Sequence, residues 1–173
     1  GYDTKLNGDI KDNTSYSIVT WLKNIFITND VNITAYAFYN LVNVDYVSLP
    51  NTLESIGEYA FAENRTLSVV RFAEGFKMEA VPGHLFQNAT ALIGFNLGGD
   101  VKSNKDLTNI RRRLPDCVIT IGDYAFDGCN NEKFIDFSIS NNVTTIGKYA
   151  FSRTKSIVSF GFEETCQIET LSE

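Results

Sequence analysis

Ile121-Gly122-Asp123-Tyr124-Ala125-Phe126 is the clearest copy of a phrase that recurs along this chain of 173 residues. Its other copies are Ile56-Gly57-Glu58-Tyr59-Ala60-Phe61, Ile146-Gly147-Lys148-Tyr149-Ala150-Phe151 and, more loosely, Ile33-Thr34-Ala35-Tyr36-Ala37-Phe38 and Val81-Pro82-Gly83-His84-Leu85-Phe86. The final Phe residues of consecutive copies lie 23, 25, 40 and 25 residues apart. Repetition with a period of roughly 20–30 residues predicts a solenoid, in which each turn stacks on its neighbours to bury a continuous core.

Each phrase is followed by a second apolar pattern. Apolar residues return six, nine and eleven positions after the final Phe, as Leu67, Val70 and Phe72 do after Phe61. After Phe126 the sixth position is Glu132, which departs from the pattern, and the ninth and eleventh are Ile135 and Phe137. A spacing of two residues predicts a short strand whose alternate side chains point into the core. Stacked turns would align these strands as a parallel sheet.

The glycine and the phenylalanine of the phrase have separate expected roles. Gly57, Gly122 and Gly147 lie where the chain turns a corner, and we expect them to supply positive φ angles, which glycine tolerates. The Ala-Phe pair that follows is expected to fill the core from the side opposite the strands.

Two longer stretches carry a family resemblance. Residues Val44 to Phe61 read VDYVSLPNTLESIGEYAF, and Leu114 to Cys129 read LPDCVITIGDYAFDGC. This pattern, which extends over residues 20–171, resembles the BspA-type leucine-rich repeat of bacterial and protist surface proteins. The resemblance implies an α/β-type leucine-rich-repeat solenoid, right-handed, with mostly short parallel strands, turns and short helical pieces. We expect about five to six repeats of 23–25 residues with one insertion.

The chain reads as a single domain with an N-terminal cap over residues 1–20 and repeats over 21–173, interrupted by an insertion at about 98–113. A short helix is one interpretation of the insertion, because Ser103 resembles an N-cap and Pro115 would end the helix. Leu107, Ile110 and Leu114 would share its apolar face. A degenerate extra turn is the alternative, because Leu114-Pro115 aligns with Leu49-Pro50.

The residues that point outward from the strands are the predicted binding surface, because repeat proteins commonly bind through such a face. Aromatic rings and arginines are the residue types that anchor interfaces. The candidates are Phe26, Tyr46, Arg71, Asn96, Phe134 and Asp136. The alternative is that these side chains pack against the insertion or against another part of a larger protein.

Arg111-Arg112-Arg113 is the one dense run of charge in the sequence, and it lies in the insertion. Three adjacent guanidinium groups can contact an anion or an acidic partner. The alternative is a solvated loop with no partner.

The sequence offers no assembled catalytic, metal or cofactor site. His84 is the only histidine, and it takes the place that tyrosine holds in the other phrases, which predicts a ring in a stacked column. Cys117, Cys129 and Cys166 show neither a zinc-ligand spacing nor an even disulfide count, and we expect free structural thiols. An enzyme is therefore not expected.

Charge and hydropathy narrow the class of partner. The net charge of −6 argues against nucleic acid, and no apolar run approaches the roughly 20 residues that span a bilayer. The family resemblance implies an extracellular or cell-surface location and an adhesive role. The predicted function is a non-enzymatic module that binds an extracellular protein or glycan through its strand face. The alternative is an architectural spacer with no ligand of its own.

Overall fold

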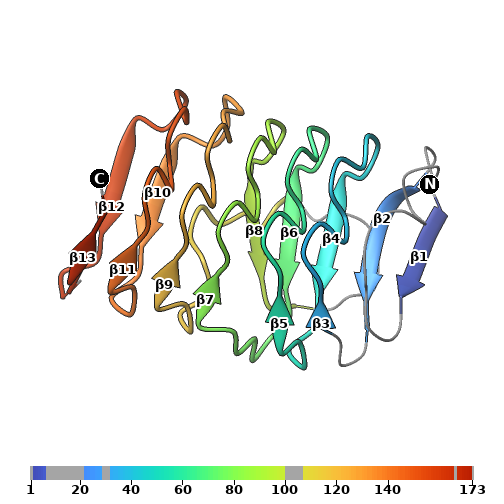
Figure 1. Cartoon of the computed structure of the whole chain (residues 1–173), viewed down its shortest axis with the longest axis horizontal. Coiled ribbons are helices and arrows are strands. Elements are labelled where there is room, and N and C mark those ends of the chain that lie inside the picture. The colour runs from blue at the N-terminus through green and yellow to red at the C-terminus, as the bar shows by residue number, and fades with distance from the viewer. Residues whose placement is uncertain (1, 7–21, 29–31, 100–106, 166, 173) are drawn as a thin grey trace.

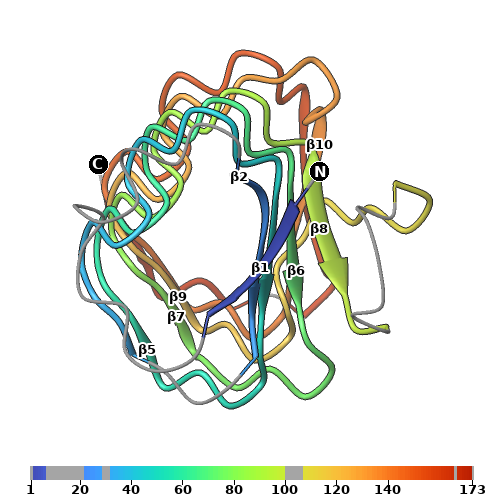
Figure 2. The same cartoon turned by 90° about the vertical axis from the view of Figure 1, so that its right-hand side faces the viewer.

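The computed structural model describes residues 2–6, 22–28, 32–99, 107–165 and 167–172, and these form a solenoid of stacked turns (Figure 1). Each regular turn contributes one longer strand to one side of the solenoid and one strand of two residues to another side, while the phrases form the remaining side (Figure 2). The predicted solenoid of parallel strands is therefore confirmed. The predicted cap over residues 1–20 lies mostly outside the described residues.

The longer strands lie side by side and run parallel. Five of them form one sheet in the order β1 (Tyr2–Leu6), β2 (Leu22–Ile27), β4 (Tyr46–Leu49), β6 (Val69–Phe72) and β8 (Gly94–Leu97). Two more form a pair, β10 (Asp136–Ile139) and β12 (Ser159–Phe162). Val47, Val70 and Phe95 are opposite one another in this register, and all three are fully buried. The predicted alternation of inward and outward residues holds here.

The short strands pair in the same parallel manner. They are β3 (Asn32–Ile33) with β5 (Ser55–Ile56), and β7 (Ala80–Val81), β9 (Thr120–Ile121), β11 (Thr145–Ile146) and β13 (Thr170–Leu171). The second residue of each strand up to β11 is buried, and it is the apolar residue that opens a phrase. These strands therefore tie the start of every phrase to the core.

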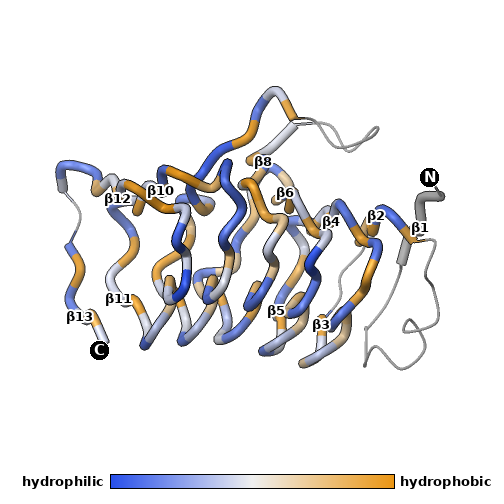
Figure 3. Tube along the Cα trace, turned by 90° about the horizontal axis from the view of Figure 1, so that it is seen from above, coloured by the Kyte–Doolittle hydropathy of each residue, from blue (hydrophilic) through white to orange (hydrophobic). Residues whose placement is uncertain are grey.

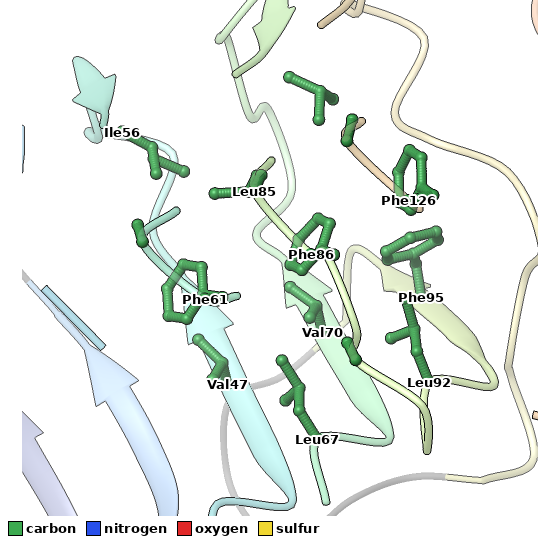
Figure 4. Close-up of a cluster of buried hydrophobic side chains, with 14 of the residues drawn as sticks. Val47, Ile56, Phe61, Leu67, Val70, Leu85, Phe86, Leu92, Phe95 and Phe126 are labelled. Carbon is green, nitrogen blue, oxygen red and sulfur yellow. The ribbon is translucent and has the colours of Figure 1, made fainter. Parts of the chain in front are cut away.

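The final Phe residues of the phrases form a column through the core. Phe38 and Phe61 lie 5.2 Å apart between ring centroids, and Phe86 and Phe126 lie 5.6 Å apart. These four rings are fully buried, and Figure 4 shows how Phe61, Phe86 and Phe126 meet aliphatic side chains from the strands. The predicted packing of the phrase against the strands is confirmed.

The glycines of the phrase are required for a different reason from the predicted one. None of Gly57, Gly122 and Gly147 has a positive φ. A Cβ on Gly57 would instead lie 2.2 Å from the backbone nitrogen of Ala35, and a Cβ on Gly122 would lie 2.5 Å from that of Gly83. The prediction of positive φ was wrong, because glycine serves here to let the backbones of adjacent turns approach closely.

The positive φ angles belong to the aromatic residues of the phrase. Tyr36, Tyr59, His84, Tyr124 and Tyr149 have φ between 54° and 62°, a conformation that bulky residues rarely adopt. Their rings stack, and the ring of His84 lies 4.1 Å from that of Tyr59 and 4.8 Å from that of Tyr124. The prediction that His84 is one ring in a stacked column is confirmed.

The insertion contains no helix in its described residues. Arg111 and Phe95 exchange two backbone hydrogen bonds of 2.7 Å as an antiparallel bridge, and Arg113 forms a parallel bridge with Ser138. Residues 111–114 therefore occupy a strand position between β8 and β10. On the other side of the solenoid, β7 pairs directly with β9. The insertion thus adds one strand-like segment to the side of the longer strands and none between β7 and β9 on the side of the short strands.

The helix interpretation was wrong over residues 107–114, because the three residues expected on one helical face lie in different environments. Leu107 is 55% exposed, Ile110 packs on the outside of the sheet, and Leu114 is buried in the main core. The alignment of Leu114-Pro115 with Leu49-Pro50 correctly placed Leu114 in the core. The expected N-cap at Ser103 lies outside the described residues.

In one turn the longer strand begins two residues later than the sequence pattern indicated. In the structure Phe137 is opposite Phe160 and Ile139 is opposite Phe162. The inward residues of this turn therefore stand eleven and thirteen positions after Phe126, not nine and eleven. Phe134 consequently takes the core position that Glu132 appeared to occupy.

Candidate binding surface on the strand face

The strand face is the outward surface of β2, β4, β6, β8, β10 and β12. Six of its residues were expected to face water. The structure buries five of them, Phe26, Tyr46, Arg71, Asn96 and Phe134, and leaves only Asp136 exposed. The expectation of exposure was therefore wrong for these five, for the three separate reasons given below.

Phe26 and Tyr46 belong to a second hydrophobic cluster, which lies on the outside of the sheet. Their rings are 5.7 Å apart, each residue is only 4% exposed, and Val69 lies beside them. Ile110 of the insertion packs against this cluster. The alternative in which these rings pack against the insertion is thus the one that the structure supports.

Arg71 and Asn96 hold the two ends of the insertion against the sheet. The guanidinium of Arg71 donates hydrogen bonds to Ser48 Oγ at 3.2 Å and to the carbonyl of Gly99. The amide of Asn96 donates to the carbonyl of Asn109 at 3.2 Å. We call residues 98–99 and 107–113 the insertion arm, and Figure 3 shows the insertion projecting from the side of the longer strands.

Phe134 lies in the main core because of the two-residue shift after Phe126. It is 1% exposed, and its ring lies 5.6 Å from that of Phe137. Asp136 remains on the outward side, where its carboxylate accepts a hydrogen bond from Ser159 Oγ. In this half of the molecule the strand face consists of small polar side chains that are open to solvent, among them Ser138.

The three consecutive arginines do not form one cluster. Arg111 is exposed, and Arg112 donates a hydrogen bond of 2.7 Å from Nε to the carbonyl of Lys133. Arg113 pairs with Asp116 and lies 3.8 Å from Glu163. The arginines therefore point to different neighbours, and the prediction of a joint contact remains untested.

Two grooves flank the insertion arm. The first, which we call the basic groove, has a volume of about 510 Å³ and is lined by Lys23, Asn43, Asp45, Arg65, Thr66, Ser68, Ala91, Ile93, Leu107, Asn131, Glu132 and Lys133. It lies where the longer strands begin. The sequence did not predict this groove, because its cations lie outside the outward-facing strand positions and come from turns that are far apart in the chain.

The second groove lies where the longer strands end. It has a volume of about 520 Å³ and is lined by Phe72, Ala73, Glu74, Gly75, Phe76, Leu97, Gly98, Gly99, Arg113, Pro115, Asp116 and Cys117. Its floor is apolar, and its one cation, Arg113, is already paired with Asp116. The arm thus separates a basic groove from a groove in which carboxylates outnumber cations.

The two described thiols and the histidine each contact a neighbouring polar group. Burial raises the pKa of the Cys129 thiol, which contacts the carbonyl of Phe86 at 3.2 Å, and burial also raises the pKa of Cys117. Both are free thiols, as predicted, while Cys166 lies outside the described residues. A raised pKa suppresses the reactive thiolate. His84 Nδ1 lies 3.1 Å from Gln87 Oε1.

Neither a metal cluster nor a membrane-spanning helix is found in the described part of the chain. No group of three His, Cys, Asp or Glu side chains in that part could hold a metal ion. No helix there has the length and hydrophobicity needed to cross a bilayer.

These features define a leucine-rich-repeat solenoid with an insertion on its strand face. The sequence profile of the BspA type leucine rich repeat region matches the chain in six copies, over residues 9–110 and 103–172. The chain therefore belongs to the BspA-type leucine-rich-repeat family. No curated protein matches the chain.

Solved bacterial leucine-rich-repeat structures share the fold. One from Bacteroides ovatus is 21% identical with a TM-score of 0.61, covering 84% of this chain and 32% of its own. The Treponema pallidum leucine rich repeat protein is 19% identical with a TM-score of 0.61, covering 82% of this chain and 71% of its own. A leucine rich cell surface protein from Faecalibacterium prausnitzii is 21% identical with a TM-score of 0.56, covering 92% and 43%. The chain thus spans less than half the length of two of the three.

Proposed function

We propose that this chain is a non-enzymatic, surface-exposed binding module that holds an extracellular protein or glycan on its strand face. The observation that carries the proposal is the basic groove beside the insertion arm, where side chains from several turns line one concavity of about 510 Å³. Small-molecule and glycan-sized ligands occupy concave sites of a few hundred Å³. Leu107 of the insertion arm forms part of the wall of this groove.

The family and the structural relatives support the location in this proposal. The match to the BspA-type repeat covers nearly the whole chain, and one relative of the same fold is described as a cell surface protein. The proposed partner is therefore extracellular, and the proposed contacts are those of the grooves. The buried rings of Phe26 and Tyr46 pack against Ile110 and so hold the insertion arm on the sheet.

The test is a binding screen against extracellular matrix proteins and a glycan array, followed by charge reversal in the basic groove. Lys133→Glu is compared with Lys148→Glu, which makes the same charge change at an exposed lysine of the phrase, away from the strand face. We expect the affinity for a partner found in the screen to fall about tenfold for Lys133→Glu and to stay unchanged for Lys148→Glu. Equal affinities for both variants would refute binding at this groove.

An architectural spacer is the second candidate function. The specific observation in its favour is that the chain's own insertion arm covers the part of the strand face that carries the aromatic rings. A spacer predicts that the screen finds no partner, and that a longer protein containing this chain loses reach, but no affinity, when turns are deleted.

A further inference from the structure

We infer that the ligand of the basic groove is an acidic glycan, an oligosaccharide that carries carboxylate or sulfate groups. This inference rests on the proposed function and specifies the ligand class for the same groove. Lys23, Arg65 and Lys133 come from three different turns and line one concavity, whereas the chain as a whole has a net charge of −6. Cations are thus gathered at this place against the overall charge of the protein.

The cations of the groove differ in how far they are already engaged. Arg65 pairs with Glu63 at 3.1 Å. Lys23 and Lys133 are both exposed, and neither forms an ion pair with a described residue. Arg112 adds a further cation next to the groove, because its Nε donates to the carbonyl of Lys133 at 2.7 Å. The groove therefore keeps positive charge available for a ligand.

The carboxylates of the groove do not cancel this charge. Glu132 and Asp45 both line it, and Asp45 Oδ1 accepts a hydrogen bond of 2.5 Å from Ser68 Oγ. The groove itself has three cations and two carboxylates, and with the neighbouring Arg112 and Glu63 the count is four cations against three carboxylates. An anionic ligand is consequently favoured over a cationic or neutral one, and the attraction will weaken with added salt.

The remaining lining fits a sugar. Asn43, Asn131, Ile93 and Leu107 line the groove, and the amide of Asn131 already donates to the carbonyl of Ala91 at 3.1 Å and accepts from Lys133 N at 2.9 Å. Sugars present hydroxyl groups that amides can bind and C–H faces that pack on apolar side chains. The volume of about 510 Å³ also falls in the range of a small-ligand site.

An acidic peptide fits the groove less well. One common way for a peptide to bind beside a sheet is to pair its backbone with an exposed strand edge. The strands behind this groove are β2, β4 and β6, and each of them is already paired with a neighbour on both sides. The groove therefore offers side chains but no free backbone edge.

The test measures the affinity of the 173-residue chain for three probes of six units each by isothermal titration calorimetry. The probes are a heparin-derived sulfated hexasaccharide, neutral maltohexaose and the acidic peptide hexaglutamate. We expect the sulfated hexasaccharide to bind more tightly than the other two, with an affinity that falls as salt is added. Lys23→Glu and Lys133→Glu should each weaken it about tenfold, while Lys148→Glu should not.

The outcomes separate the inference from the proposed function. Tighter binding of hexaglutamate, or an equal loss of affinity in Lys148→Glu, would overturn the acidic glycan. If a neutral glycan or a protein binds and Lys133→Glu abolishes that binding, the proposed function stands and this inference fails. If a partner binds and no groove variant alters its affinity, the site itself is wrong and both fail.

Discussion

Gly122 lies against the backbone of the preceding turn, and the same contact recurs at Gly57 and Gly147. Each of these glycines allows an approach that a single carbon atom would prevent. The residues of the turn with an unfavourable positive φ are instead the tyrosines of the phrase and His84. Sequence reasoning assigned the positive φ to the glycines, because a glycine beside a corner is usually explained by φ, and the approach of another turn cannot be seen in one repeat.

Gly122→Ala should destabilise the protein by about 1–3 kcal/mol, the usual cost of forcing extra atoms into a packed site. Its Cβ would lie 2.5 Å from Gly83 N, so one of the two turns must shift. Urea denaturation of the variant measures the change. Gly161→Ala is the control, because its Cβ would come no closer to its neighbours than 3.2 Å, to Ser138 Oγ, and would lie 3.9 Å from the Ser138 backbone. Equal midpoints for the two variants would contradict the close-approach explanation.

Asp127 should make the stability depend on pH. Burial raises its pKa, but hydrogen bonds from Arg153 at 2.8 Å and Gln87 at 2.9 Å, together with the charge of Arg153, outweigh burial and leave the pKa lowered. A carboxyl whose pKa is lowered by folding stabilises the protein above its unfolded pKa of about 3.9, and this stabilisation disappears as the pH falls below that value.

The wild type should therefore be more stable than Asp127→Asn at pH 6, and the difference should shrink as the pH falls from about 4 towards 2. Urea midpoints measured across this range give the result. Glu132→Gln, which removes an exposed carboxylate, controls for the change in net charge. A constant difference between wild type and Asp127→Asn at every pH would show that the carboxylate charge is not involved.

At the scale of the element, the insertion arm changes what the strand face can do. It places Ile110 on the cluster of Phe26, Tyr46 and Val69, and its carbonyls accept hydrogen bonds from Arg71 and Asn96. Sequence reasoning located the insertion, but it could not place Ile110 against residues of much earlier turns. This contact depends on where the chain returns to the sheet, and no local pattern encodes that point.

Ile110→Asp should destabilise the protein by about 1–3 kcal/mol, because it places a carboxylate against an apolar cluster. Leu107→Asp is the matched control in the same arm, and its 55% exposed side chain should tolerate the change with little effect. Thermal unfolding followed by circular dichroism measures both. If both variants melted together with the wild type, the arm would not be seated on the cluster.

For the whole molecule, the repeat pattern predicted the solenoid, the Phe column and the stacked position of His84. Those features recur in every turn, and each copy of the phrase supports the others. The candidate binding residues were predicted less well, because exposure depends on the irregular parts. Phe134 is an example. It is buried because the strand after Phe126 begins two residues late, and the polar Glu132 at an expected apolar position was the only sign of this shift in the sequence. The basic groove was not predicted, because its cations share no spacing in the sequence.

The extra strand-like segment of residues 111–114 also changes the spacing along the strand face. Neighbouring strands lie about 4.8 Å apart, so this segment lengthens the side of the longer strands by roughly that amount. On the side of the short strands β7 pairs directly with β9, and the sheet is interrupted earlier, between β5 and β7. Residues 111–114 bridge β8 on one side and β10 on the other, so they divide the strand face into two parts. A partner that contacts both parts must therefore cross residues 111–114.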